Sequence, residues 1–379
     1  MRIFISAGEP SGDLHGANLV QALQQFHHGI ECEGFGGERM EAAGCRLHYP
    51  LSRLAVMFFA RVLANAPTFL SLLSRTDRYF RHHRPDAVVL IDYPGFNWWV
   101  ARRARFHGIP VFYFVPPQLW AWAGWRVRKM RRYVDHVLCT LPFEVEWYRQ
   151  RGVAAHYVGH PYFDELRLQR PDSEFLERYQ GNDNLVALLP GSRTQEVTRN
   201  LPTLIRAATQ IHRERPDARF LVACFKDTQR QLVEAQVRGL GLPIETFVGR
   251  TPEIIRAARA CVSVSGSVSL ELLYHGKPSV VLYRISKFDL MVARWFMTTR
   301  YISLVNLLAE KELFPEFLTD RCEAPAIAEK VLTWLNEPAV YGERCRALAE
   351  LREQVAQPGA ITRAAQFVLD TLGALPLAA

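Results

Sequence analysis

The chain has 379 residues, of which 49% are hydrophobic and 22% are charged, and its formal net charge is +8 at pH 7. This composition excludes a disordered or fibrous chain and supplies enough apolar material for two globular domains. The positive charge favours anionic partners, such as phosphorylated ligands, anionic lipid surfaces or nucleic acid.

A strand, a glycine-containing turn and a helix open the chain. Residues 2–6 are a short apolar strand, 7–12 (AGEPSG) are the turn, and 13–25 are the helix. Gly8 and Gly12 allow close backbone approach. Because the turn matches neither G-x-G-x-x-G nor a P-loop, a dinucleotide site is not expected here. The turn does lie at the carboxyl end of a strand, where open α/β sheets bind ligands.

The longest apolar stretch follows a second short strand near 33–36. It covers 54–73 (LAVMFFARVLANAPTFLSLL) and is interrupted by Arg61, Asn65 and Pro67. A membrane span needs roughly 18–20 consecutive apolar residues. The stretch can therefore lie in a membrane interface, but we do not expect it to cross a bilayer.

A carboxylate follows the next buried strand. Residues 87–91 (AVVLI) form this strand, and the turn after it runs from Asp92 to Asn97. A carboxylate at the carboxyl end of a central parallel strand is costly unless it is solvated or used, so Asp92 is a candidate general base. The alternative is that Asp92 caps the following helix, which a turn rich in Pro and Gly also allows.

A basic segment comes later in this half. It follows a predicted helix at 98–107, a strand at 109–115 and a loop at 116–122 that contains Gln118 and two tryptophans. The segment itself, 126–132 (RVRKMRR), has five cations in seven residues. Cations beside tryptophans are typical of nucleic-acid or anionic-lipid binding. A solvated helix face, with the tryptophans in the core, is equally consistent with the pattern.

Two more strands complete a first Rossmann-like half. The stretches 159–161 (GHP) and 169–172 (QRPD) have the composition of a hinge between domains. His160 in this hinge could act in catalysis or could simply be hydrogen-bonded.

The strand 186–189 begins a second half with the same alternation of strands and helices. It ends in a Pro-Gly turn, after which Ser192 or Thr194 can cap the next helix. Backbone N–H groups at a helix start, beside the guanidinium of Arg193, can bind phosphate oxygens. An ordinary strand-to-helix turn with a solvated arginine is the alternative.

A second turn of the phosphate-binding type follows strand 261–264. Ser265, Gly266 and Ser267 are small residues that let a pyrophosphate approach a helix start, and their hydroxyls can supplement the N–H groups. Glu271 shares a helix face with Ser267 and lies one turn further on, within reach of a ribose diol. Alternatively, Glu271 only complements the helix dipole.

The last quarter of the chain is predicted to be mostly helical. Residues 284–300 form an amphipathic, cationic helix rich in aromatics, and the Asn306 amide in the loop that follows could bind a base or a phosphate. Helices over 325–373 then return toward the first half. Two Rossmann-like α/β halves that face a cleft, with C-terminal helices running back, make up the GT-B fold. The domain boundaries predicted from this pattern give a first domain of 1–165 with helices from about 345–379, and a second domain of 166–344.

Ten short motifs, spread over nearly the whole chain, occur in the order found in one known family. They are 6–13 (SAGEPSGD), 34–40 (GFGGERM), 91–97 (IDYPGFN), 120–122 (WAW), 141–144 (LPFE), 158–161 (VGHP), 188–193 (LLPGSR), 265–271 (SGSVSLE), 283–286 (YRIS) and 301–306 (YISLVN). In these motifs the chain resembles bacterial lipid-A-disaccharide synthases, which are membrane-associated inverting glycosyltransferases. It departs from the family pattern at Phe58, Arg61, Pro117 and Val305.

The resemblance implies an activity. The enzyme would condense UDP-2,3-diacylglucosamine with 2,3-diacylglucosamine 1-phosphate to give the β-1,6-linked lipid A disaccharide 1-phosphate and UDP. The resemblance implies no required metal and no other cofactor. The first domain would bind the acceptor and the second the UDP-sugar.

The resemblance also implies roles for individual residues. Asp92 matches the essential aspartate and is the candidate base, with Glu9 as the other candidate, and Arg193 matches an essential arginine that can stabilise the departing UDP. With the turns described above, the donor set is Ser192, Arg193, Ser265, Gly266, Ser267, Glu271 and Asn306. The acceptor-side set is Ser11, Gly12, Asn97 and Gln118.

The expected partners are the UDP-diacylglucosamine donor, the acylated glucosamine phosphate acceptor and the surface of the inner membrane, contacted peripherally from the cytoplasm. Seven widely spaced cysteines without a C-x-x-C pair fit a reducing compartment. Nucleic acid is not expected as a partner, and the sequence leaves open whether the chain forms a homodimer. Two other readings stay open: another UDP-sugar enzyme of the same fold, such as a UDP-N-acetylglucosamine 2-epimerase, or a non-catalytic membrane-binding relative.

Overall fold

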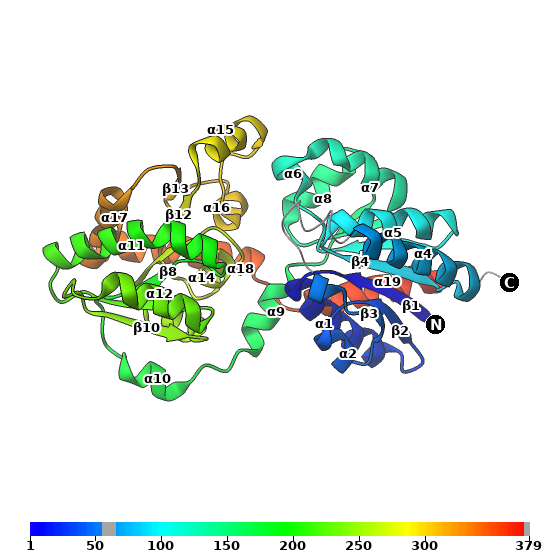
Figure 1. The fold of residues 1–379 in the computed structure, drawn as a ribbon, viewed down its shortest axis with the longest axis horizontal. Coiled ribbons are helices and arrows are strands. Elements are labelled where there is room, and N and C mark those ends of the chain that lie inside the picture. Colours follow the sequence, from blue (N-terminus) through cyan, green and yellow to red (C-terminus); the bar gives the residue numbers. More distant parts are fainter. Residues whose placement is uncertain (55–65, 375–379) are drawn as a thin grey trace. The chain divides into compact units, whose positions relative to one another are not determined.

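The computed structural model describes residues 1–54 and 66–374 and divides into two compact units (Figure 1). The first unit comprises Met1–Asp164 together with the C-terminal segment from Gln357, and the second comprises Glu165–Ala356. Each unit contains one sheet in which all strand pairs are parallel. Phe58, Arg61 and most of the apolar stretch 54–73 lie outside the described residues.

The first unit is built on a seven-stranded sheet in the order β3-β2-β1-β4-β5-β6-β7. Its central strands are continuous apolar runs because both faces of a parallel sheet are covered by helices. The strands are β1 (Arg2–Ala7), β2 (Glu31–Phe35), β3 (Arg46–Tyr49), β4 (Ala87–Ile91), β5 (Val111–Phe114), β6 (His136–Cys139) and β7 (Ala155–Tyr157).

Helices cover both faces of this sheet. On one face α1 packs against α19, which comes from the C-terminal end of the chain, and on the other face α4, α5 and α7 pack together. The helices of this unit are α1 (Pro10–Phe26), α2 (Glu38–Ala42), α4 (Ala66–His83), α5 (Pro94–Phe106), α6 (Leu119–Trp122), α7 (Val127–Tyr133), α8 (Pro142–Arg149) and α19 (Ala360–Ala374), and α9 (Pro161–Leu168) spans the border between the units.

The second unit is built on a six-stranded sheet in the order β10-β9-β8-β11-β12-β13. Its strands are β8 (Leu185–Leu189), β9 (Arg219–Cys224), β10 (Ile244–Val248), β11 (Ala260–Ser263), β12 (Ser279–Arg284) and β13 (Glu316–Thr319). Its helices are α10 (Ser173–Arg178), α11 (Thr194–Glu214), α12 (Asp227–Val237), α13 (Thr251–Ala257), α14 (Val268–Tyr274), α15 (Lys287–Phe296), α16 (Leu304–Ala309), α17 (Ala324–Asn336) and α18 (Pro338–Val355).

The strand order of each sheet contains one switch point. In the first sheet the order turns between β1 and β4, and in the second it turns between β8 and β11. Helices that follow the two strands at such a point leave in opposite directions, which opens a crevice at the carboxyl ends of the strands. The turns after β1, β4, β8 and β11 are therefore the places where each unit can bind a ligand.

The described C-terminal helices belong to different units. The helices from about residue 345 were predicted to belong to the first domain, but α18 packs on α14 and α17 of the second unit. Of these helices, α19 is the one that packs on the first unit, against α1. An amphipathic pattern predicts a helix but does not say which of two similar sheets it covers.

Candidate functional site

The turns after β1 and β4 contact each other in the first unit. A Cβ added at Gly8 would lie 2.1 Å from the ring of Tyr93, so the two turns can approach this closely only with glycine at that position. Glu9 stands at the N-cap of α1 and is half-buried, and Ser11 is exposed on the first turn of the helix. The predicted acceptor-side residue Gly12 faces the end of β4, because a Cβ there would lie 3.7 Å from the Ile91 carbonyl oxygen.

Asp92 lies at this contact in a strained backbone conformation. Asp92 and Tyr93 both have positive φ angles, of 45° and 46°. The Asp92 carbonyl oxygen accepts hydrogen bonds from the Tyr113 hydroxyl at 2.8 Å and from the Asn97 amide at 2.7 Å. Strain of this kind persists where the surrounding structure fixes it, and it is concentrated at functional sites.

Burial raises the pKa of the Asp92 carboxyl. A hydrogen bond with the Tyr93 backbone and the nearby charge of His15 act in the opposite direction on this pKa. His15 itself is buried on α1, three residues after Gly12, which approaches Ile91. A carboxylate with a raised pKa at a ligand-binding edge has the properties of a general base.

Asn97 has its polar atoms directed into the protein. Its amide nitrogen donates to the carbonyl oxygens of Ser6, Ile91 and Asp92, and its oxygen accepts from the Ser6 hydroxyl at 2.6 Å. Asn97 thus joins the carboxyl ends of β1 and β4. Gln118, by contrast, is exposed in the turn after β5.

His160 is held in the neutral form. Burial, with a smaller effect of the His15 charge, lowers the pKa of His160 to about 3. Its Nδ1 accepts a hydrogen bond from the Tyr162 backbone N–H at 3.2 Å. These contacts match the hydrogen-bonded reading of His160.

In the second unit, the turn after β8 presents Arg193 to solvent. The Arg193 guanidinium pairs with the Glu196 carboxylate at 2.9 Å, and the Arg193 backbone N–H also donates to Glu196 at 3.3 Å. The carboxylate of Glu196 therefore caps α11, and neither Ser192 nor Thr194 does so. Gly191 has φ of 121°, and a Cβ there would lie 2.7 Å from the Glu196 carboxylate.

The turn after β11 is fixed by side-chain hydrogen bonds and is partly exposed to solvent. The Ser265 hydroxyl donates to the Ile302 carbonyl at 3.0 Å, and the Ser269 hydroxyl donates to the Gly266 carbonyl at 2.8 Å. Gly266 and Ser267 are exposed. The turn can therefore present its backbone to an anionic ligand.

Glu271 and Asn306, both predicted to contact the donor, are buried and bonded to protein groups. Glu271 accepts a hydrogen bond from Gln169 at 3.4 Å. The Asn306 amide donates to the Phe314 carbonyl and to Glu316, and its oxygen accepts the Leu313 and Phe314 N–H groups. These side chains hold the loops around the turn in place.

Three residues that support these turns were not predicted from the sequence. Gln229 donates to the Ser192 carbonyl at 2.9 Å, and Glu316 accepts the backbone N–H groups of Ile302 and Ser303. Glu196 lies three residues after Arg193, a spacing typical of a carboxylate that caps a helix start, so its role could have been inferred. Gln229 has the position of a residue that caps the start of α12, and its side chain accepts the Phe225 N–H there. Its contact with Ser192, and the contacts of Glu316 with Ile302 and Ser303, join residues distant in sequence and follow from no local pattern.

Within 1–54 and 66–374, no group of three or more His, Cys, Asp or Glu side chains is arranged to hold a metal ion. No helix in the described part of the chain is both long and apolar enough to span a bilayer.

Comparisons with known proteins cover both units. A family model described as lipid-A-disaccharide synthetase matches residues 3–370. A lipid-A-disaccharide synthase of Myxococcus xanthus is 36% identical over 373 residues, which are 98% of this chain and 97% of that protein.

Solved structures share the fold at low sequence identity. A co-structure of S. aureus MnaA with UDP has a TM-score of 0.68 at 12% identity and covers 99% of this chain and 97% of its own. The crystal structure of Acinetobacter baumannii MurG has a TM-score of 0.60 at 14% identity and covers 99% of each chain. At such identities the likeness shows the fold alone, which is GT-B with two Rossmann-like domains.

Proposed function

The chain belongs to the lipid-A-disaccharide synthetase family, and from this premise we propose that its first unit activates the acceptor and its second unit binds the UDP-sugar donor. The chain is a glycosyltransferase that forms the lipid A disaccharide, and the epimerase reading is not favoured. The proposed donor is UDP-2,3-diacylglucosamine and the proposed acceptor is 2,3-diacylglucosamine 1-phosphate. The observation that carries the division of roles is that the two predicted sets of residues lie mainly at the switch points of two different sheets.

Asp92 is the proposed general base. In this mechanism its carboxylate takes the proton of the acceptor 6-hydroxyl while that oxygen attacks C1 of the donor sugar. The bond between C1 and the UDP oxygen breaks, and the configuration at C1 inverts. The raised pKa of Asp92 supports this role, because a carboxyl that is more basic than usual accepts a proton more readily. Glu9, on the neighbouring turn, is the alternative base.

The departing UDP is proposed to bind at the turns after β8 and β11. The guanidinium of Arg193 and the exposed turn of Ser265, Gly266 and Ser267 would stabilise the negative charge that develops on the pyrophosphate. Arg193 pairs with Glu196 in the free chain, so it must exchange this partner for phosphate oxygens when the donor binds. We assign Glu271 and Asn306 to positioning these turns, since both are buried and bonded to protein groups.

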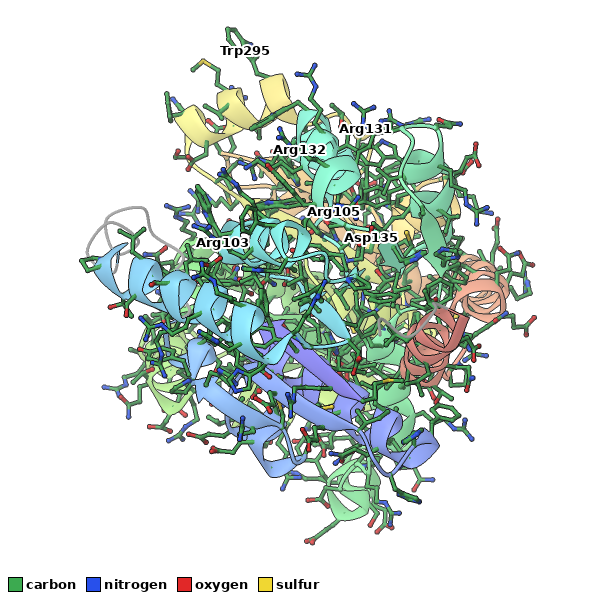
Figure 2. The ribbon with its side chains drawn as sticks, turned by 90° about the vertical axis from the view of Figure 1, so that its right-hand side faces the viewer. Arg103, Arg105, Arg131, Arg132, Asp135 and Trp295 are labelled. Carbon is green, nitrogen blue, oxygen red and sulfur yellow. The ribbon has the colours of Figure 1, made fainter. Side chains whose placement is uncertain are left out.

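Peripheral association with the cytoplasmic face of the inner membrane is proposed for the same protein. In the first unit, Trp99 on α5 and Trp125 just before α7 are exposed. Figure 2 labels basic residues of the same two helices, Arg103 and Arg105 on α5 and Arg131 and Arg132 on α7. Exposed tryptophans beside cations are typical of binding to an anionic lipid interface. Sedimentation with vesicles that contain anionic lipid, weakened by replacing Arg131 and Arg132 with Gln, checks this point. Unchanged sedimentation would argue against it.

The activity is tested with the purified chain, both proposed substrates and detection of the disaccharide. Asp92→Asn should abolish product because the amide cannot accept the proton. Asp77→Asn is a matched control, because Asp77 is a half-buried carboxylate of the same unit that lies away from the proposed site. It pairs with His107, which comes before the amino end of β5, whereas Asp92 follows the carboxyl end of β4. Near-normal product with Asp92→Asn, or no product from the unchanged chain, contradicts the proposal.

A further inference from the structure

Helix α15 of the second unit carries apolar residues on two faces. Leu290 and Ala293 face inward and are buried, whereas Met291 and Trp295 are exposed. Trp295 is 84% exposed and extends away from the end of the helix (Figure 2). A helix that only covers a sheet needs a single apolar stripe, so packing within the unit does not account for the second face.

A cavity of about 760 Å³ lies between α15 and β13. Leu290, Met291 and Trp295 line it from the helix, and Phe317 and Leu318 line it from the strand. Its volume is in the range of about 300–1,000 Å³ that is usual for ligand sites. Strand β13 is the edge strand of its sheet, so this wall is not covered by a further strand.

The cavity opens at the ligand-binding edge of the second sheet. Lys287, the first residue of α15, and Asp320, which follows β13, both line it. Because all pairs in this sheet are parallel, the carboxyl ends of β12 and β13 lie at the same edge as the turns after β8 and β11.

Hydrogen bonds connect the wall of the cavity to the proposed UDP turn. Glu316, which lines the cavity, accepts the Ile302 N–H at 2.7 Å and the Asn306 amide at 2.7 Å. The carbonyl of Ile302 in turn accepts the Ser265 hydroxyl at 3.0 Å. The cavity and the turn after β11 are thus parts of one connected structure.

We propose that this cavity binds an acyl chain of the UDP-diacylglucosamine donor. The inference rests on the proposed binding of UDP at the turn after β11, which places the acylated sugar in the same unit as the cavity. The lining combines apolar side chains, which can contact a hydrocarbon chain, with charged side chains, which can contact the polar groups of the same amphiphile. The charged residues are Lys287, Glu316, Asp320, Arg321 and Glu323. A contact with a bilayer alone would use exposed apolar residues of α15 outside the cavity, such as Phe288, as much as those that line it.

The test compares Met291→Glu with the unchanged chain in detergent micelles. Met291 is 54% exposed, so the substitution is compatible with folding. A charge on the cavity wall should raise the KM for the long-chain donor by about tenfold or more, and it should leave the Kd for UDP, which has no acyl chain, unchanged. With a donor of shortened acyl chains the difference in KM between the two proteins should shrink.

Two further variants define the outcome. Leu240→Glu changes a comparably exposed apolar residue of the same unit, 49% exposed and absent from the cavity lining, and should not alter the donor KM. Phe288 lies on α15 outside the cavity lining. If Phe288→Glu raises the donor KM as much as Met291→Glu does, the proposal is overturned in favour of a surface contact. A normal KM for Met291→Glu would also overturn it. If the unchanged chain does not bind UDP at all, the proposed function fails, and the acyl-chain proposal is not the cause.

Discussion

Asp92 is fixed in space by its backbone as well as by its side chain. Two consecutive residues with positive φ, neither of them glycine, cost about 1–3 kcal/mol each. The Tyr113 hydroxyl and the Asn97 amide bind the Asp92 carbonyl oxygen and hold this conformation. A base fixed in this way does not need to reorganise when the acceptor binds.

The pH dependence of transfer tests the role of Asp92. Because burial raises its pKa, kcat/KM should fall as the pH decreases through a value above the usual carboxyl range of about 4. The nearby charge of His15 lowers this pKa, so His15→Gln should move the acidic limb of the profile to higher pH. The measurement is kcat/KM for the acceptor against pH in both proteins. If the acidic limb does not move in His15→Gln, the group that titrates there is not Asp92.

For single residues, the sequence locates the turns but does not show whether a polar side chain points to a ligand or into the protein. Asp92 and Arg193 follow apolar runs that end in Pro and Gly, so their turns can be located from local chemistry. Asn97 and Asn306 occupy equally suggestive positions, but their amides bind backbone groups of the protein. Their partners are identified only when the strands and loops are assembled.

Helix α19 completes the first unit, although it comes from the end of the chain. It buries Ile361, Ala364 and Val368 against the core that also contains residues of α1. Asp164 accepts the N–H groups of Gly359 and Ile361 at the start of the helix, and Arg363 donates to the Val158 carbonyl at 2.8 Å. The Asp164 carboxylate and the Arg363 guanidinium thus add polar attachments to the apolar packing of α19 on the first unit.

Removing this carboxylate should destabilise the first unit. Hydrogen bonds to a charged group contribute about 1.5–3 kcal/mol each, so we expect Asp164→Ala to lower the free energy of unfolding by about that amount or more. Urea unfolding of the full chain, followed by a probe in the first unit, measures the change. The control is Asp183→Ala, at a side chain that is 85% exposed and should matter by less than about 0.5 kcal/mol. Equal effects of the two variants would show that Asp164 does not hold the helix.

The elements that were predicted and those that were missed differ in composition. The strands β4 and β8 are uninterrupted apolar runs and were predicted from the sequence. Strands β3 (RLHY) and β13 (EFLT) were missed because they lie at the edges of their sheets and carry polar residues. The unit to which α18 belongs was also missed, because that depends on contacts far along the chain.

At the scale of the whole molecule, buried titratable groups act on stability in opposite directions. Burial lowers the pKa of His160 to about 3, whereas burial raises the pKa of Glu144 to about 7. In an unfolded chain these groups titrate near their ordinary values of about 6.5 and 4.3. Unfolding at pH 5 to 6 therefore adds a proton at His160 and releases one at Glu144.

These two groups predict opposite slopes of stability with pH. Because His160 binds more protons in the unfolded state, it makes the protein less stable as the pH falls below about 6.5, by about 1.4 kcal/mol per pH unit between pH 4 and 6. Glu144 binds more protons in the folded state and makes the protein more stable as the pH falls from 7 to about 4.3. Between pH 4.5 and 6.5, the slope of the free energy of unfolding with rising pH should become more negative in His160→Gln, which keeps the Glu144 effect, and more positive in Glu144→Gln, which keeps the His160 effect. Identical slopes in the three proteins would contradict this assignment.

The division of the chemistry between two sheets leads to one decisive comparison. Calorimetric titration with UDP measures donor-side binding without any chemical step. Asp92→Asn should bind UDP with the Kd of the unchanged chain although it forms no disaccharide, whereas Arg193→Ala should bind UDP more weakly and lose about 10²- to 10³-fold in turnover. The opposite pattern, with UDP binding lost in Asp92→Asn and retained in Arg193→Ala, would contradict the account.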